Sequence, residues 1–133
     1  TFKNYAGRWV GEGMLGLRDS PTEKVKCRAT YFLTEGKDEM TQNIRCATAG
    51  GSVEIKSAIA NANGALSGTW QETTRNIGGD LTGQILPTGL KITVKSNDIA
   101  ANMEIVLRDN RQIVEIQFID SAMIGLTLIL TKG

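Results

Sequence analysis

The sequence predicts an all-β protein, a single up-and-down antiparallel β-barrel of about eight to ten strands connected as a meander. Apolar and polar residues alternate along most of the chain, and turn signals separate the alternating runs. No stretch has helical periodicity or the length that a parallel crossover needs. The 133 residues are enough for one domain with a sizeable core, which we place at residues 1–133.

Residues 25–46 give the clearest register. Folding this stretch about Gly36 sets Cys27 opposite Cys46 and places the apolar residues of both strands on one face. Opposed Cα atoms of antiparallel strands lie about 4.5–5.5 Å apart, within disulfide range. We therefore expect a Cys27–Cys46 disulfide that stabilises the fold by roughly 3 kcal/mol. Two buried free thiols are the alternative.

The disulfide predicts an oxidising compartment, so a periplasmic or secreted protein. The chain shows no signal peptide, as expected of a mature form that begins near Thr1.

The remaining strands follow in chain order. Thr1 to Ala6 is expected to form a lead-in, one helical turn that packs Phe2 and Tyr5. The expected inward-facing sets are Gly7, Trp9, Gly11, Gly13 and Leu15; Val53, Ile55, Ser57 and Ile59; Leu66, Gly68, Trp70 and Glu72; Leu81, Gly83 and Ile85; Leu90, Ile92 and Val94; Ala101, Met103, Ile105 and Leu107; Val114, Ile116 and Phe118; and Ile124, Leu126, Leu128 and Leu130. The turn Asn76–Gly79 is expected to set Trp70 opposite Gly83.

Closure of the sheet follows from the matched faces. Each predicted turn keeps apolar faces opposed, as in the pairs Ile85 with Leu90 and Ile105 with Val114. An even strand count lets the last strand pair antiparallel with the first. Closure removes both exposed edges, which favours a barrel over an open sheet.

Composition excludes several functions. The net charge is +1 with both signs scattered, so no nucleic-acid partner is expected. No apolar run approaches the ~18 residues of a membrane span. The chain contains no histidine, which removes the usual general base and histidine-ligated metals. We predict a protein that is not an enzyme and has no cofactor and no metal site.

Two short motifs carry a family resemblance. Gly7-Arg8-Trp9 on the first strand resembles the Gly-x-Trp opening of calycin-type barrels, namely lipocalins, fatty-acid-binding proteins and avidins. Gly68-Thr69-Trp70 is similar to strand sequences in avidins. In lipocalins a basic residue of the last strand packs across the first tryptophan, and Lys132 is the positional candidate.

The chain also departs from these families. It lacks the helical lid of fatty-acid-binding proteins, the biotin cage of avidins and the histidine of nitrobindin-like haem barrels. It looks most like small exported barrel proteins of alpha-proteobacteria, a resemblance that implies a fold and a compartment but no ligand.

Gly11-Glu12-Gly13-Met14-Leu15-Gly16 matches the G-x-G-x-x-G pattern of dinucleotide-binding sites. That fingerprint needs a helix directly after it, and the following LRDSPTEK does not form one. We interpret the glycines as positions of close strand approach in a small barrel.

A polar row forms the candidate ligand site. The predicted registers place Tyr31 beside Gln42, and Gln42 beside Ser57, on a face otherwise built of apolar residues. Convergent polar groups on an apolar wall are typical of ligand sites. The alternative is that the three satisfy one another, or a buried water, in a filled core.

Trp70 and Glu72 complete the candidate site. Trp70 is expected to belong to the core, and Glu72 shares its inward phase. A buried carboxylate tends to have a raised pKa. Alternatively, Glu72 lies at the barrel rim in contact with solvent, which the following Thr73-Thr74-Arg75 favours.

Two functional hypotheses follow. The first is a non-enzymatic barrel that binds a small apolar or amphipathic ligand in its interior, since ten strands enclose more space than eight. The second is a protein-interaction module with a filled core, such as a periplasmic hydrolase inhibitor. We expect a monomer or a weak homo-oligomer.

Overall fold

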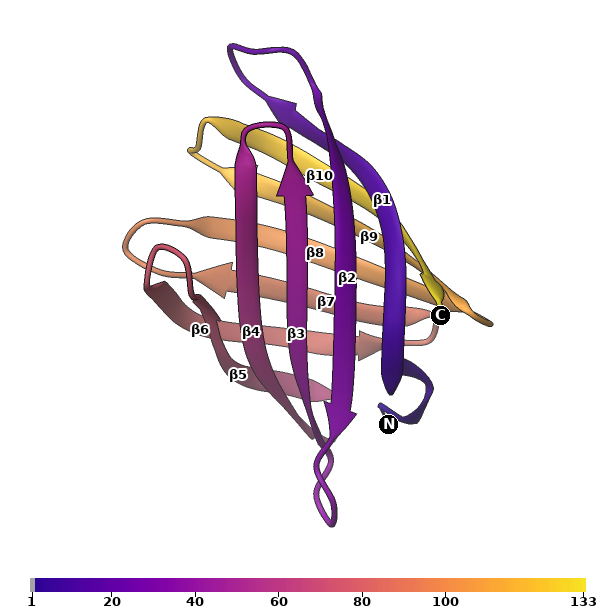
Figure 1. Cartoon of the computed structure of the whole chain (residues 1–133). Helices are drawn as coiled ribbons and strands as arrows, with labels where there is room; N and C mark the ends of the chain where they lie inside the picture. Colours follow the sequence, from indigo (N-terminus) through magenta and orange to yellow (C-terminus); the bar gives the residue numbers. More distant parts are fainter. Residues whose placement is uncertain (1) are drawn as a thin grey trace.

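The structure, a computed structural model, describes residues 2–133 and consists of one short 3-10 helix followed by ten strands. The elements are η1 (Lys3–Tyr5), β1 (Gly7–Leu17), β2 (Glu23–Leu33), β3 (Glu39–Thr48), β4 (Gly51–Ala62), β5 (Ala65–Glu72), β6 (Ile77–Leu86), β7 (Gly89–Lys95), β8 (Ala100–Arg108), β9 (Arg111–Ile119) and β10 (Met123–Lys132). Each strand pairs antiparallel with the next, and β1 pairs with β10, which closes the barrel. Figure 1 shows β1 to β4 crossing steeply in front of β6 to β9. The predicted up-and-down antiparallel barrel is confirmed.

The register of the cysteine hairpin is also confirmed. Cys27 pairs with Cys46 and Tyr31 with Gln42, and the two cysteines form a disulfide with their Cα atoms 4.1 Å apart. On the other side of β3, Gln42 pairs with Ser57 of β4 as expected. The predicted pairs Ile85 with Leu90 and Ile105 with Val114 are present as well.

One predicted register is wrong. Trp70 pairs with Gly79, not with Gly83, because β6 already begins at Ile77 and the turn is made by residues 73–76. Gly78 and Gly79 therefore lie within a strand. A Cβ on Gly79 would lie 2.1 Å from the carbonyl oxygen of Lys95, so glycine serves close strand approach here. The difference is four residues, an even number, so every side chain of β6 keeps its predicted face.

The glycines of β1 bring the two closing strands together. A Cβ on Gly11 would lie 1.9 Å from the backbone oxygen of Ile129, and one on Gly13 would lie 1.7 Å from that of Thr127. Strand β1 continues to Leu17 without a following helix. The G-x-G-x-x-G stretch is thus part of the barrel wall, as we interpreted it.

The lead-in closes one end of the barrel, which we call the sealed end. Phe2 and Tyr5 are buried, and the Trp9 indole Nε1 donates a 2.8 Å hydrogen bond to the carbonyl oxygen of Tyr5. The Lys132 Nζ lies 5.7 Å from the centroid of the Trp9 ring, the arrangement that the lipocalin resemblance implies. Thr1 lies outside the described residues.

The other end carries the turns at residues 18–22, 49–50 and 73–76, and we call it the distal end. Most inward-facing apolar side chains toward this end are only partly buried, whereas most of those near the sealed end are fully buried. The exceptions near the sealed end are Leu33, which is exposed, and Ile85 and Leu107, which are partly buried. The partly buried set comprises Leu15, Ile44, Cys46, Ile77, Val94, Ile99, Met103, Ile116 and Leu126. The tightly packed core therefore sits toward the sealed end.

Candidate functional site

The predicted polar row forms a hydrogen-bonded chain. The Ser57 hydroxyl donates to Gln42 Oε1 at 3.0 Å, and Gln42 Nε2 donates to the Tyr31 hydroxyl at 2.9 Å. These side chains come from β4, β3 and β2, whose inward positions at this level lie side by side. The structure thus brings the three residues together as the registers predicted.

A fourth residue, Gln112 of β9, extends the chain on the inner side of β1 and β10, the two strands that separate β2 from β9. The Tyr31 hydroxyl donates to Gln112 Oε1 at 3.1 Å, and the Gln112 side chain is fully buried. Sequence reasoning missed Gln112, although it shares the inward phase of Val114. This shared phase was the sequence signal that could have placed Gln112 inside the barrel. Its partner Tyr31 lies 81 residues away, so no local pattern links the two.

Two buried donors have no hydrogen-bond partner within residues 2–133, namely Gln112 Nε2 and Trp70 Nε1. Gln112 has one unpaired polar atom whichever way its amide is turned, because its single hydrogen bond uses only one of the two polar atoms of the amide. A buried donor left unpaired costs about 1–3 kcal/mol. Such groups are unusual in a native fold and indicate a place where a polar partner binds.

Burial also controls the ionisation of the tyrosines. Burial raises the pKa of the Tyr31 hydroxyl well above its usual range, and the neighbouring Tyr5 raises it further. The hydrogen bonds that Tyr31 makes with Gln42 and Gln112 lower the pKa, but by less. The centroids of the two tyrosine rings are 5.8 Å apart. Tyr31 therefore remains a neutral hydroxyl that can both donate and accept.

Glu72 is the last residue of β5 and lies at the distal rim, as the alternative predicted. Only 5% of its surface is exposed, so it is buried as its phase predicted and is not in free contact with solvent. Its predicted pKa shift has the wrong direction. Burial raises the pKa, but hydrogen bonds from the side chain and backbone of Thr74, from Arg75 and from the backbone of Glu54 outweigh it and lower the value to about 2.

The role of the Glu72 carboxylate is visible in these contacts. It accepts from the Thr74 amide at 2.8 Å and from the Arg75 amide and guanidinium at 2.9 and 3.0 Å. These donors belong to the turn between β5 and β6, so Glu72 organises that turn. Because the Glu72 oxygens accept these hydrogen bonds, the turn forms at residues 73–76, earlier in the chain than Gly78 and Gly79 suggested.

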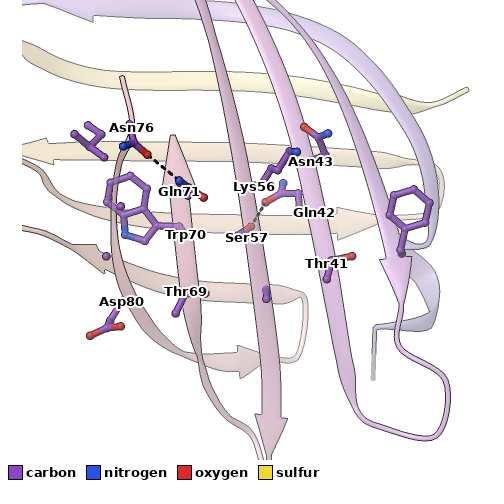
Figure 2. Close-up of a pocket in the computed structure, with 15 residues that line it drawn as sticks. Thr41, Gln42, Asn43, Lys56, Ser57, Thr69, Trp70, Gln71, Asn76 and Asp80 are labelled. Carbon is purple, nitrogen blue, oxygen red and sulfur yellow. Dashed lines mark hydrogen bonds between the residues drawn. The ribbon is translucent and has the colours of Figure 1, made fainter. Parts of the chain in front are cut away.

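A shallow depression of about 660 Å³ lies over strands β2 to β6 (Figure 2). Its lining includes Gln42, Ser57 and Trp70, three of the five predicted site residues, together with outward-facing polar residues and Phe32. Figure 2 shows the Trp70 indole on the β6 side of β5, beside the hydrogen bond between Gln71 and Asn76. Tyr31 and Glu72 do not line this depression.

Within residues 2–133, no three or more histidine, cysteine, aspartate or glutamate side chains gather as metal ligands would. Among the same residues, no helix has the length and apolar character that crossing a membrane requires.

No protein-family model matches the chain, and no curated protein sequence matches it significantly. Among solved structures, the chain is similar to Rv2717c from M. tuberculosis, with a TM-score of 0.78 and 13% sequence identity. The match covers 96% of this chain and 92% of that chain. At this identity the likeness concerns the barrel fold alone.

Proposed function

We propose that the protein binds a small amphipathic ligand inside the barrel and catalyses no reaction. The polar end of the ligand contacts the chain Ser57, Gln42, Tyr31 and Gln112, and its apolar part lies along the partly buried inward residues toward the distal end. The observation that carries this proposal is the fully buried Gln112 amide with an unpaired polar atom. A ligand acceptor there removes a cost of about 1–3 kcal/mol.

The charges of the inner wall favour a neutral ligand. Among the inward-facing positions of the ten strands, the only basic residue is Lys132, which lies over Trp9 at the sealed end. Glu72 adds a negative charge toward the distal end. A ligand carboxylate would lose its hydration without gaining a counter-charge. The polar end is therefore an alcohol, ketone, ester or amide.

The family and the compartment belong to the same proposal. The barrel fold and the Lys132–Trp9 contact support a calycin-like protein of the lipocalin, fatty-acid-binding or avidin type. The Cys27–Cys46 disulfide supports a periplasmic or secreted location, because such bonds persist in oxidising compartments.

Thermal unfolding with four probes tests the ligand class. We expect cholesterol, oleyl alcohol or the flavonoid quercetin to raise the melting temperature, and oleate to raise it less than oleyl alcohol. Ligands that bind only the folded state stabilise it in proportion to the logarithm of their concentration. The absence of a shift with every probe contradicts the proposal.

A double variant tests the site itself. Tyr31→Phe with Gln112→Leu removes the donors at the buried end of the chain and keeps the side-chain volumes similar. We expect binding of the best probe to weaken at least about tenfold. The melting temperature without ligand should change little, because the variant removes the unpaired Gln112 amide but also takes the Tyr31 acceptor away from the part-buried Gln42 Nε2. Thr82→Val, on the outward face of β6, is the matched control. Unchanged affinity in the double variant contradicts the assigned site.

A second candidate function rests on the hairpin between β2 and β3, which projects beyond the barrel in Figure 1. Phe32 is 60% exposed and Leu33 is 47% exposed beside its turn. Exposed apolar residues on a projecting loop suit a protein-interaction module such as a hydrolase inhibitor. In that case the lipid probes leave the melting temperature unchanged, and Phe32→Ser abolishes inhibition found in a panel of periplasmic-type hydrolases.

A further inference from the structure

The outward face of β8, β9 and β10 carries three parallel rows of side chains, and we call it the striped face. Glu104 pairs with Glu115 in an acidic row, and Arg108 pairs with Arg111 in a basic row. Between them lies an apolar row formed by Val106, Ile113 and Ile129. Ile129 is 49% exposed, and the four charged residues are exposed.

Within the described residues, no ion pair compensates either of the two charged rows. Like charges directly opposite on neighbouring strands destabilise a sheet. Lys91 lies across from Glu104 on β7, but within residues 2–133 none of the four charged residues has an ion pair within 4.0 Å. By contrast, Arg45, which faces Arg28 elsewhere on the barrel, has an ion pair with Glu54. The striped face is therefore unusual for this protein.

We propose that the striped face binds the striped face of a second copy of the chain. The twofold axis runs along the apolar row, parallel to the line from Val106 to Ile129. Rotation about this axis reverses the strand direction, so the acidic row of each copy lies on the basic row of the other. The apolar row meets itself at the centre. The interface is thus isologous, as in most symmetric dimers.

The charge pattern selects this partner and this orientation. An axis along the strands would place Glu104 and Glu115 on the same residues of the other copy, which is repulsive. Rows two residues apart are separated by about 6.8 Å along a strand, and packed sheets lie about 10 Å apart. Glutamate and arginine side chains span that gap, while the shorter valine and isoleucine side chains fill its middle.

The dimer is expected to be weak and sensitive to salt. The outer surface of a barrel is convex, so two copies meet over a smaller area than the ~800 Å² per partner of a standard interface. Much of the stabilisation comes from solvent-exposed charges, which salt screens. Sedimentation velocity over a concentration series should show association that decreases between low and high salt.

Charge reversal tests the orientation. One variant combines Glu104→Arg with Glu115→Arg, and the other combines Arg108→Glu with Arg111→Glu. In each variant all charges of the striped face have one sign, so we expect self-association to weaken at least about tenfold relative to the native chain. An equimolar mixture of the two variants should associate again, because their faces are complementary.

Recovery in the mixture cannot arise from misfolding, since a misfolded variant would not regain a specific partner. The combined charge reversal of Lys26→Glu and Arg28→Glu, on the outward face of β2, is the matched control and should leave association unchanged. A native chain that stays monomeric at every concentration overturns the proposal. So does a mixture that associates no better than its components. Neither result bears on ligand binding in the interior.

Discussion

Glu72 and Gln112 are the polar side chains that the described residues bury most completely, and their surroundings differ. The carboxylate of Glu72 is held by amides, a hydroxyl and a guanidinium of the adjoining turn. The amide of Gln112 has one partner, Tyr31. Because a fully bonded group serves the fold and a half-bonded one can still gain a partner, we assign Glu72 to the turn and Gln112 to the ligand site.

Replacing the Glu72 carboxylate should make stability depend on pH in a defined direction. Glu72→Gln is expected to lower the free energy of unfolding at neutral pH by about 1–3 kcal/mol, because hydrogen bonds to a charged acceptor are lost. The folded-state pKa is below the ordinary value of 4.5, so this stabilisation is complete above 4.5 and is lost as the pH falls toward about 2.

Urea unfolding of both proteins between neutral pH and the acid limit measures this difference. Glu35→Gln, in the exposed turn after β2, is the control and should change little at any pH. A difference between Glu72→Gln and the native chain that stays constant with pH contradicts the assignment of the carboxylate to the turn.

Neighbouring strands of the barrel are brought together in two different ways. Hairpins such as the one between β4 and β5 are set by local turn chemistry, with Asn63 and Gly64 both at positive φ. Strands β1 and β10 lie at opposite ends of the chain, and they approach closely because Gly11 and Gly13 lack a Cβ. Closure of the barrel therefore depends on glycine at these positions.

Gly11→Ala should weaken closure. Its Cβ would lie 1.9 Å from the backbone oxygen of Ile129, so the strands must separate. We expect the free energy of unfolding to fall by about 1–3 kcal/mol, as for overpacked sites. Amide hydrogen exchange should accelerate first in β1 and β10. Gly50→Ala is the matched control, because its Cβ has no neighbour nearer than 3.7 Å. An equal loss of stability in both variants is inconsistent with this explanation.

At the scale of the whole molecule, the barrel has one sealed end and one end whose inner wall is partly exposed. The lead-in, Trp9 and Lys132 pack together at the sealed end, and the ring of Tyr5, in the lead-in, lies beside the ring of Tyr31. The polar chain thus ends in the best-packed part of the molecule. This gradient of packing places a polar anchor deep inside and an apolar wall toward solvent.

The two tyrosines should report on the opening of the sealed end. Burial raises the pKa of Tyr5 from 10.0 to about 12, and that of Tyr31 is raised further. The stabilisation that the two neutral tyrosines contribute is therefore complete below pH 10 and is lost as the pH rises through their folded-state pKa values. We expect tyrosinate absorbance to appear together with unfolding, in one transition.

The chain has only two tyrosines, so the absorbance is simple to assign. The urea-unfolded chain is the control and should titrate near pH 10. Ionisation of one tyrosine near that pH with the barrel still folded would show that the sealed end is open.

The sequence by itself determined the strands, the disulfide and three members of the polar chain. These depend on period-2 alternation and on turns that join neighbouring strands, so each register follows from a few local residues. The pairing of Tyr31, Gln42 and Ser57 is of this kind. Only the β5–β6 register was misplaced among the registers named above, because glycines that serve close strand approach look the same as turn glycines.

The tertiary structure decided what depends on contacts across the barrel or on the competition between burial and hydrogen bonding. Gln112 reaches Tyr31 only because the closed barrel brings β9 and β2 to the same interior. The pKa of Glu72 falls because the turn directs several donors at a buried carboxylate, and their sum exceeds the cost of desolvation. Local alternation fixes which face a side chain takes, whereas its partners depend on how the whole sheet coils and closes.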